Sequence, residues 1–289
     1  MKNKKEKVGQ GKPEEMPREI IIVGSWNQLM DLLHENAWNK KIMRHRSNYL
    51  FRGHSKSDYE LCAGLSRNGG KQVQLEKHLF RNFLKYARSH LGSSENRPNN
   101  FWHWIALAQH HGLPTRLLDW TYSPMIAAHF ACSNLDHRHC DGAIWMVDYH
   151  RAHRDLDEDF RAQLDAEGAH VFTDEMLSKI VSSLDAIGLT REKEQVLFFE
   201  PPSVSSRIIN QHACFSVQIG HCKPMDSWLY EHRGFWKKII VPKELKWEIR
   251  DKLDQSNITE RVLFPGLDGM CAWLARQYFP RIENSIVHS

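Results

Sequence analysis

The densest group of side chains able to do chemistry lies in the segment QHHGLPTRLLDWTYS, at residues 109–123. A Gly/Pro turn joins two apolar stretches there, and polar side chains occur on both sides of the turn. Polar groups this close to buried segments must be hydrogen-bonded or take part in a function. Acid–base, cationic and hydroxyl groups occur together in this segment, namely Gln109, His110, His111, Arg116, Asp119, Thr121 and Ser123. This concentration favours a ligand pocket.

A purely structural role for the same segment stays open. Gly112 suits the end of a helix, and Arg116 would then pair with Asp119 across the turn. Ser123 directly precedes Pro124, and this order is typical of a helix start. Under this interpretation the segment stabilises the fold and binds nothing.

Arg52 is the second candidate for chemistry. It closes an apolar strand predicted over residues 48–53 and is followed by Gly53. A planar guanidinium can grip a phosphate, and an adjacent glycine lets the backbone approach closely. The alternative is an exposed arginine at the edge of a sheet.

Two groups of histidines and cysteines resemble metal sites without the paired spacing of a zinc site. They are Cys132, His137, His139 and Cys140, and His212, Cys214, His221 and Cys222. No metal is therefore expected. Motifs of phosphate loops, dinucleotide-binding folds and serine hydrolases are also missing from the sequence.

Strands and helices alternate along the chain and must position these residues. Apolar runs predict strands at 19–23, 48–53, 115–121, 142–149, 195–202, 214–220 and 236–242. Helical spacing and caps predict helices after Ser25 and at 74–91, 101–112, 125–132, 206–211, 243–253 and 266–279. We expect one mixed α+β domain over 19–280, with a helical insertion near 151–190 and tails at 1–18 and 281–289.

Composition excludes several classes of protein. The 289 residues are 41% hydrophobic and 26% charged, which is ordinary globular usage and excludes a disordered chain. A net charge of +4 is too small to indicate a nucleic-acid coat. No apolar run is long enough to cross a membrane, and the lysine-rich N-terminus lacks the apolar region of a signal peptide. We expect a disordered basic tail at 1–18 and a cytoplasmic location.

Several segments together resemble the FRG-domain family, named for its Phe-Arg-Gly motif. They are YLFRG (49–53), WIALAQHHGLPTRLLDWTYSPMIAAHFAC (104–132), DGAIWMV (141–147), SRIINQHACFSV (206–217) and ERVLFPGLDG (260–269). The similarity extends over most of 19–275. The family is widespread in bacteria and phages, often in mobile or defence-related settings. The resemblance implies a defence or toxin effector.

A shorter similarity links the chain to ADP-ribosyltransferases of the Arg-Ser-Glu class. Arg52 matches the arginine, Thr121-Tyr122-Ser123 the central motif, and Glu260 the glutamate. The similarity implies a split sheet flanked by helices, and NAD as substrate. Arg52 would hold the pyrophosphate and Ser123 would support the nicotinamide-side strand. Glu260 would accept from the ribose 2′-OH and stabilise an oxocarbenium-like transition state.

The same resemblance implies that the pocket is lined by further residues, namely Gly53, Gln109, His110, Arg116, Asp119 and Thr121. The residue two positions before Glu260 is Ile258, where transferases that modify proteins commonly have Glu or Gln. This favours NAD hydrolysis or a nucleic-acid acceptor over protein modification. Asp268 and Glu200 are rival carboxylates.

Two other classes of function stay open. The first is a non-catalytic module that binds a nucleotide, a nucleic acid or a partner protein through its aromatic and basic residues. The second is a hydrolase or nuclease that uses His110, His111 and Asp119.

Overall fold

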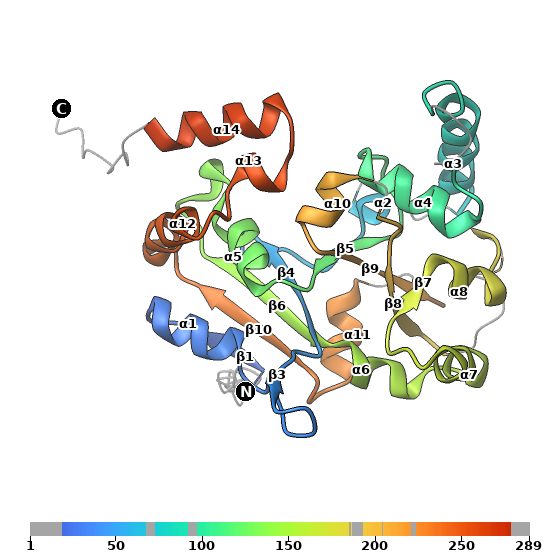
Figure 1. The fold of residues 1–289 in the computed structure, drawn as a ribbon, viewed down its shortest axis with the longest axis horizontal. Helices are drawn as coiled ribbons and strands as arrows, with labels where there is room; N and C mark the ends of the chain where they lie inside the picture. The colour runs from blue at the N-terminus through green and yellow to red at the C-terminus, as the bar shows by residue number, and fades with distance from the viewer. Residues whose placement is uncertain are drawn as a thin grey trace, which may run out of the picture.

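A mixed sheet runs through the computed structural model, which describes residues 19–67, 73–91, 97–184, 186, 193–203, 205–220 and 224–278. Within these residues the sheet has eight strands in the order β1-β10-β6-β4-β5-β9-β8-β7 (Figure 1). Their bounds are β1 Ile20–Ile22, β4 Tyr49–His54, β5 Leu118–Thr121, β6 Gly142–Asp148, β7 Phe172–Thr173, β8 Gln195–Glu200, β9 Ala213–Ile219 and β10 Trp236–Val241. The mixed α+β fold predicted from the sequence is confirmed. The tails at 1–18 and 281–289 lie outside the described residues.

The sheet consists of two halves that meet at one residue pair. β4 pairs with β6 along its whole length, from Tyr49 to His54. On its other side β4 pairs with β5 only through Phe51 and Thr121. β5 in turn pairs with β9 from Leu118 to Thr121. The backbone ladder is therefore almost interrupted between β4 and β5.

Helices cover one face of the two halves in two separate groups (Figure 1). Phe51, Thr121 and Ala213 lie opposite one another on β4, β5 and β9, so they share this face, and Phe215 shares it as well. Near Phe51 it is covered by α1 Trp26–Leu33, α5 Pro124–Cys132 and α12 Lys246–Gln255. Near Phe215 it is covered by α4 Phe101–His110, α7 Glu158–Glu167 and α8 Asp174–Ile180. The β4–β5 junction lies between the two groups.

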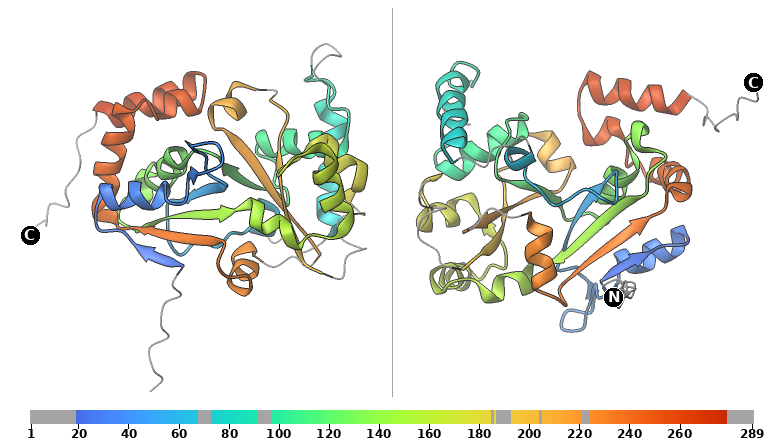
Figure 2. Two further views of the ribbon diagram at one scale, coloured as in Figure 1. Left: turned by 60° about the horizontal axis from the view of Figure 1, so that its bottom comes forward. Right: turned by 180° about the vertical axis from the view of Figure 1, so that it is seen from behind.

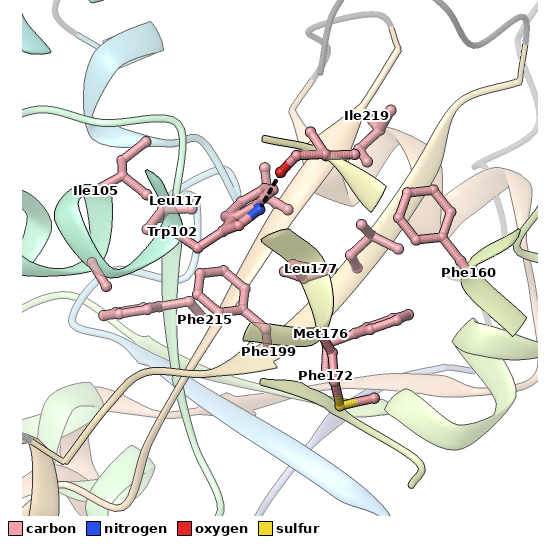
Figure 3. Close-up of a cluster of buried hydrophobic side chains, with 14 of the residues drawn as sticks. Trp102, Ile105, Leu117, Phe160, Phe172, Met176, Leu177, Phe199, Phe215 and Ile219 are labelled. Carbon is pink, nitrogen blue, oxygen red and sulfur yellow. Dashed lines mark hydrogen bonds between the residues drawn. The ribbon is translucent and has the colours of Figure 1, made fainter. Parts of the chain in front are cut away.

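The core beneath α4, α7 and α8 is built around Trp102 (Figure 3). The Trp102 ring is fully buried and packs edge-to-face against Phe199, with 5.3 Å between ring centroids. Its indole Nε1 donates to the Val181 carbonyl oxygen at 2.8 Å, so the buried polar atom is satisfied. The segment near 151–190 contributes α6 Tyr149–Ala152, α7 and α8, and also β7, which extends the sheet beside β8. The sequence did not predict this strand.

The opposite face of the sheet carries one continuous core across both halves. Leu50, Trp145 and Val147 come from the first half, and Trp120 and Phe198 from the second. The helix α11 Met225–Glu231 packs against this core. The two halves are thus joined by this core on one face of the sheet, while on the other face their helices form two separate groups.

The other elements lie around this framework (Figure 2). They are the hairpin β2 Trp38–Asn39 and β3 Arg44–His45, the helices α2 Gly64–Arg67, α3 Val73–Ala87, α10 Ser206–Asn210, α13 Glu260–Leu263 and α14 Leu267–Tyr278, and the 3₁₀ turns η2 Leu135–His137, η3 His153–Asp155 and η4 Lys243–Leu245. None of the described helices has the length and apolarity needed to cross a bilayer. α3 projects at one edge of the molecule in all views.

Gly53 allows α5 to lie directly on β4. A Cβ atom at Gly53 would lie 2.0 Å from the carbonyl oxygen of Ala127 and 2.7 Å from the amide nitrogen of Ala131. Both atoms belong to the α5 backbone and cannot rotate away as a side chain would. The glycine of the Phe-Arg-Gly motif is therefore explained by helix–sheet packing.

We predict that Gly53→Ala lowers the free energy of unfolding by about 3 kcal/mol or more, because it overpacks a backbone contact. Urea or thermal unfolding measures the loss. Gly24→Ala is the matched control, since its Cβ would meet nothing closer than a Gln28 side-chain oxygen at 3.6 Å. Equal stability of the two variants would contradict the packing argument.

Candidate functional site

A cavity of about 260 Å³ opens where β4 and β5 separate. It lies on the sheet face between α4 and α5, and α10 forms a further wall. Its apolar lining includes Phe51, Phe130, Ile208 and Phe215, and its polar lining includes Arg52, Gly53, Gln109, His110, Asp119, Thr121 and Arg207. Six of the residues proposed from the sequence are thus brought together, although they come from three separate elements.

Arg52 reaches from β4 into the opening between the half-sheets. Its side chain is 15% exposed. Its Nη1 donates to the Asp119 carbonyl oxygen at 2.5 Å and lies 3.5 Å from the Asp119 carboxylate. Its Nε donates to His54 Nε2 at 3.1 Å, while Nη2 has no hydrogen-bond partner within the described ranges. The guanidinium is therefore held in place through Nε and Nη1.

His54 supports Arg52 as a neutral acceptor. Burial, followed by the Arg52 charge, lowers the pKa of His54 to about 3. The His54 Nδ1 lies 3.3 Å from the carbonyl oxygen of Tyr59, which places the ring proton on Nδ1. The Nε2 atom is then free to accept from Arg52 at neutral pH.

A hydrogen-bond chain fixes the Asp119 carboxylate. Gln109 Nε2 lies 3.1 Å from each carboxylate oxygen of Asp119. Gln109 Oε1 accepts from the Thr115 hydroxyl at 2.7 Å, which sets the orientation of the amide. The Asp119 side chain is nevertheless 57% exposed. A carboxylate held in this way can accept from ligand hydroxyl or amino groups.

The turn between α4 and β5 brings Gln109 and Asp119 together. Gly112 has φ +85° and ends α4, with its amide bonded to the Gln109 carbonyl and the Leu113 amide to the Ala108 carbonyl. This is the paired hydrogen-bond pattern of a glycine-ended helix. The chain then returns along β5, so residues ten positions apart face each other.

His110 and Arg207 lie at the edge of the cavity. His110 Nε2 lies 3.2 Å from the hydroxyl of Ser205, the residue that caps α10. Burial lowers the pKa of His110, and the positive charge of Arg207 lowers it further. Arg207 is exposed and lies over the Phe264 ring, 5.0 Å from its centroid.

The FRG domain model matches residues 47–140. This segment of the chain is an FRG domain. The matched segment extends from β4 to the 3₁₀ turn η2 and contains Arg52, Gln109 and Asp119. The α10 and β9 walls of the cavity lie outside it. No curated protein and no solved structure matches the chain.

Arg116 of the FRG domain lies away from the cavity. It forms a bidentate ion pair with the buried Glu76 of α3, with its Nε 2.9 Å from both carboxylate oxygens. Arg116 therefore does not pair with Asp119 across the turn, and the sequence-based pairing is wrong. Its partner lies 40 positions away, where local spacing gives no signal.

Ser123 and Thr121 hold the start of α5. The Ser123 hydroxyl accepts from the Ile126 amide at 3.4 Å, and Pro124 begins the helix. Thr121 lines the cavity, donates to the Gln211 carbonyl at 2.7 Å and accepts from the Ser123 amide. Ser123 is not part of the cavity lining.

Glu260 lies at the start of α13 in a buried ion cluster. Arg276 donates to it at 2.9 and 2.8 Å, and Arg276 and Arg250 also pair with Asp254. Burial raises the pKa of Glu260, but the Arg276 hydrogen bonds and the Arg250 charge outweigh burial and hold the pKa below its ordinary value. Glu260 does not line the cavity, and the same holds for the rival carboxylates Glu200 and Asp268.

Sequence reasoning assigned no role to Arg207, His54 or Phe130. Arg207 lies in the 206–217 segment and Phe130 in the 104–132 segment, both of which resemble the family. Within the described ranges, no group of three or more histidine, cysteine or acidic side chains is placed to hold a metal ion. His221 and Cys222 lie outside those ranges.

Proposed function

We propose that the FRG domain binds a nucleotide in the cavity at the β4–β5 junction. The observation that supports this most is the buried Arg52 guanidinium, whose nearest carboxylate, Asp119, lies 3.5 Å away and is largely exposed. Burial lowers the pKa of Arg52, and the Asp119 charge opposes this only in part. A ligand phosphate would supply the missing negative charge.

The remaining lining fits the other parts of a nucleotide. Asp119 is an acceptor for ribose hydroxyls or for the amino group of a base. Phe130, Ile208 and Phe215 provide an apolar surface for a ring. His110 and Arg207 lie at the edge, where a second phosphate would pass.

The size of the cavity limits how much of a dinucleotide it encloses. Its volume of about 260 Å³ is slightly below the range of about 300–1,000 Å³ that is usual for ligand pockets. NAD would therefore place one nucleotide half inside and extend the other half past Arg207.

Cleavage of the N-glycosidic bond of NAD is a second candidate function. It is favoured by Asp119, the one carboxylate among the residues described as lining the cavity. Asp119 would stabilise positive charge at C1′ as nicotinamide leaves with the bonding electron pair. Water would then add to C1′ and lose a proton. In this proposal Asp119, and not Glu260, is the carboxylate that acts on the substrate.

Titration calorimetry with NAD, AMP and inorganic phosphate tests the proposal. We expect Asp119→Ala to weaken binding of NAD and AMP by about tenfold, since it removes acceptors for ribose. Binding of inorganic phosphate should not weaken. Asp136→Ala removes an exposed carboxylate elsewhere and is the control. If wild-type protein binds none of these ligands, the proposed nucleotide site is wrong.

Chromatography of nicotinamide released from NAD, with and without cell lysate, tests the second candidate. Release that requires Asp119 would support glycosidic cleavage, and release only with lysate would indicate a macromolecular acceptor or activator. NAD binding without release would refute cleavage and leave nucleotide binding intact. An NAD-consuming enzyme would suit a cytoplasmic defence or toxin effector.

A further inference from the structure

A groove of about 560 Å³ runs along α3, on a different part of the molecule from the nucleotide cavity. Its other walls are formed by Phe101 at the start of α4 and by residues 182–184. α3 projects at the edge of the molecule (Figure 2).

One edge of the groove is a row of cations. Lys77, Arg81 and Lys85 of α3, and Arg88, which directly follows the helix, line it at spacings of four, four and three residues. Residues at these spacings lie on one side of a helix, and eleven residues of helix extend about 16 Å. Arg81, Lys85 and Arg88 are exposed, and no carboxylate within the described ranges pairs with them.

The exposed cations Arg81, Lys85 and Arg88 are not neutralised by acids on α3. Glu76 is the sole acidic residue of α3, and it is buried against Arg116. The exposed charged side chains of α3 are therefore all cationic. This surface complements a partner that carries negative charges about one helical turn apart.

The floor of the groove is apolar. It is formed by Phe80, Leu84, Phe101 and Leu184. The rings of Phe80 and Phe101 pack edge-to-face with 5.4 Å between centroids. Both phenylalanines are half-buried and contribute to the core below. An apolar floor beside a charged row matches a partner that is apolar on one side and acidic on the other.

We propose that this groove binds an acidic amphipathic helix of a partner protein. The apolar side of that helix would lie on Phe80, Leu84 and Phe101, and its carboxylates would face the cations of α3. Single-stranded nucleic acid is the competing ligand. It is disfavoured because the paired phenylalanine rings form a packed floor, whereas single-strand sites present rings on which bases stack.

Fluorescence anisotropy with a labelled peptide of glutamate, leucine and alanine tests the proposal. The peptide has about 18 residues, with its leucines on one helical side. A second peptide has the same composition but distributes the leucines around the helix, and oligo-deoxythymidine of similar length is the third probe. We expect the amphipathic peptide to bind best, with affinity that falls as salt rises.

The double variant Arg81→Glu, Lys85→Glu should weaken peptide binding by about tenfold or more. Lys41→Glu, Arg44→Glu changes the net charge equally at exposed residues near the β2–β3 hairpin, and should leave binding within about twofold. Thermal unfolding and NAD binding of both double variants should match wild type, which separates this test from that of the nucleotide cavity. Equal loss in both variants, no peptide binding to wild type, or tighter binding of oligo-deoxythymidine would overturn the proposal.

Discussion

Arg52→Ala is expected to lower nucleotide affinity by about a hundredfold, because the variant loses charge-assisted hydrogen bonds to phosphate in a sheltered site. The side chain contributes little to the core, since its partners are the His54 ring and the Asp119 carbonyl. The melting temperature should therefore change little. Calorimetry with AMP and inorganic phosphate measures the effect, and both ligands should lose affinity.

Arg52→Lys keeps the positive charge but removes the planar guanidinium, so it tests how much each contributes to nucleotide affinity. An ammonium group cannot donate from two nitrogens to phosphate while it is held by His54, so we expect lysine to restore only a small part of the affinity. Arg44→Ala, at an exposed arginine on β3, is the control. Nucleotide binding by Arg52→Ala at wild-type strength would refute the assignment of the cavity.

Glu260→Ala is expected to lower the free energy of unfolding by about 3–5 kcal/mol, the usual cost of breaking a buried ion pair from one side. The variant leaves Arg276, which is 5% exposed, and Arg250, which is 2% exposed, with Asp254 as the remaining carboxylate. Urea unfolding at neutral pH measures the loss. Glu244→Ala, at an exposed glutamate, should unfold like wild type.

The pH dependence of this loss follows from the lowered pKa of Glu260. Its stabilisation is complete above the ordinary carboxyl pKa of 4.5 and disappears as pH falls through the lower value of the folded state. The difference in stability between wild type and Glu260→Ala should therefore shrink in acid. A folded Glu260→Ala of wild-type stability that has lost NAD cleavage would instead restore Glu260 to a catalytic role.

Local signals in the sequence predicted most of the framework. Ser25 caps α1 by accepting from the Gln28 amide at 3.2 Å, and Gly112 ends α4, both as expected from residue type. The sequence did not predict α11 or the two-residue strands β2, β3 and β7. The core holds α11, the edge of the sheet holds β7, and β2 and β3 pair with each other. Elements this short carry little periodicity of their own.

For the candidate site too, the sequence predicted some contacts and did not predict others. Gln109 and Asp119 lie together because a short turn joins their elements, so the dense motif was informative. Arg116, in the loop before β5, pairs with Glu76 of α3, and Glu260 of α13 pairs with Arg276 of α14. Spacing along the chain does not indicate either pair. A match of residue types to a catalytic triplet cannot tell a carboxylate that lines a cavity from one that is enclosed by arginines.

Because β4 and β5 share a single residue pair, a bound ligand can affect how rigidly the two half-sheets are joined. The Phe51–Thr121 pair is the one ladder contact between these strands, and Arg52 and Asp119 lie on either side of the gap beyond it. The hydrogen bond from Arg52 Nη1 to the Asp119 carbonyl oxygen already links the half-sheets there, and a molecule that engages both side chains would add a second link. Binding of a ligand in the cavity would then stiffen the whole sheet, because the core on the opposite face already joins the two halves.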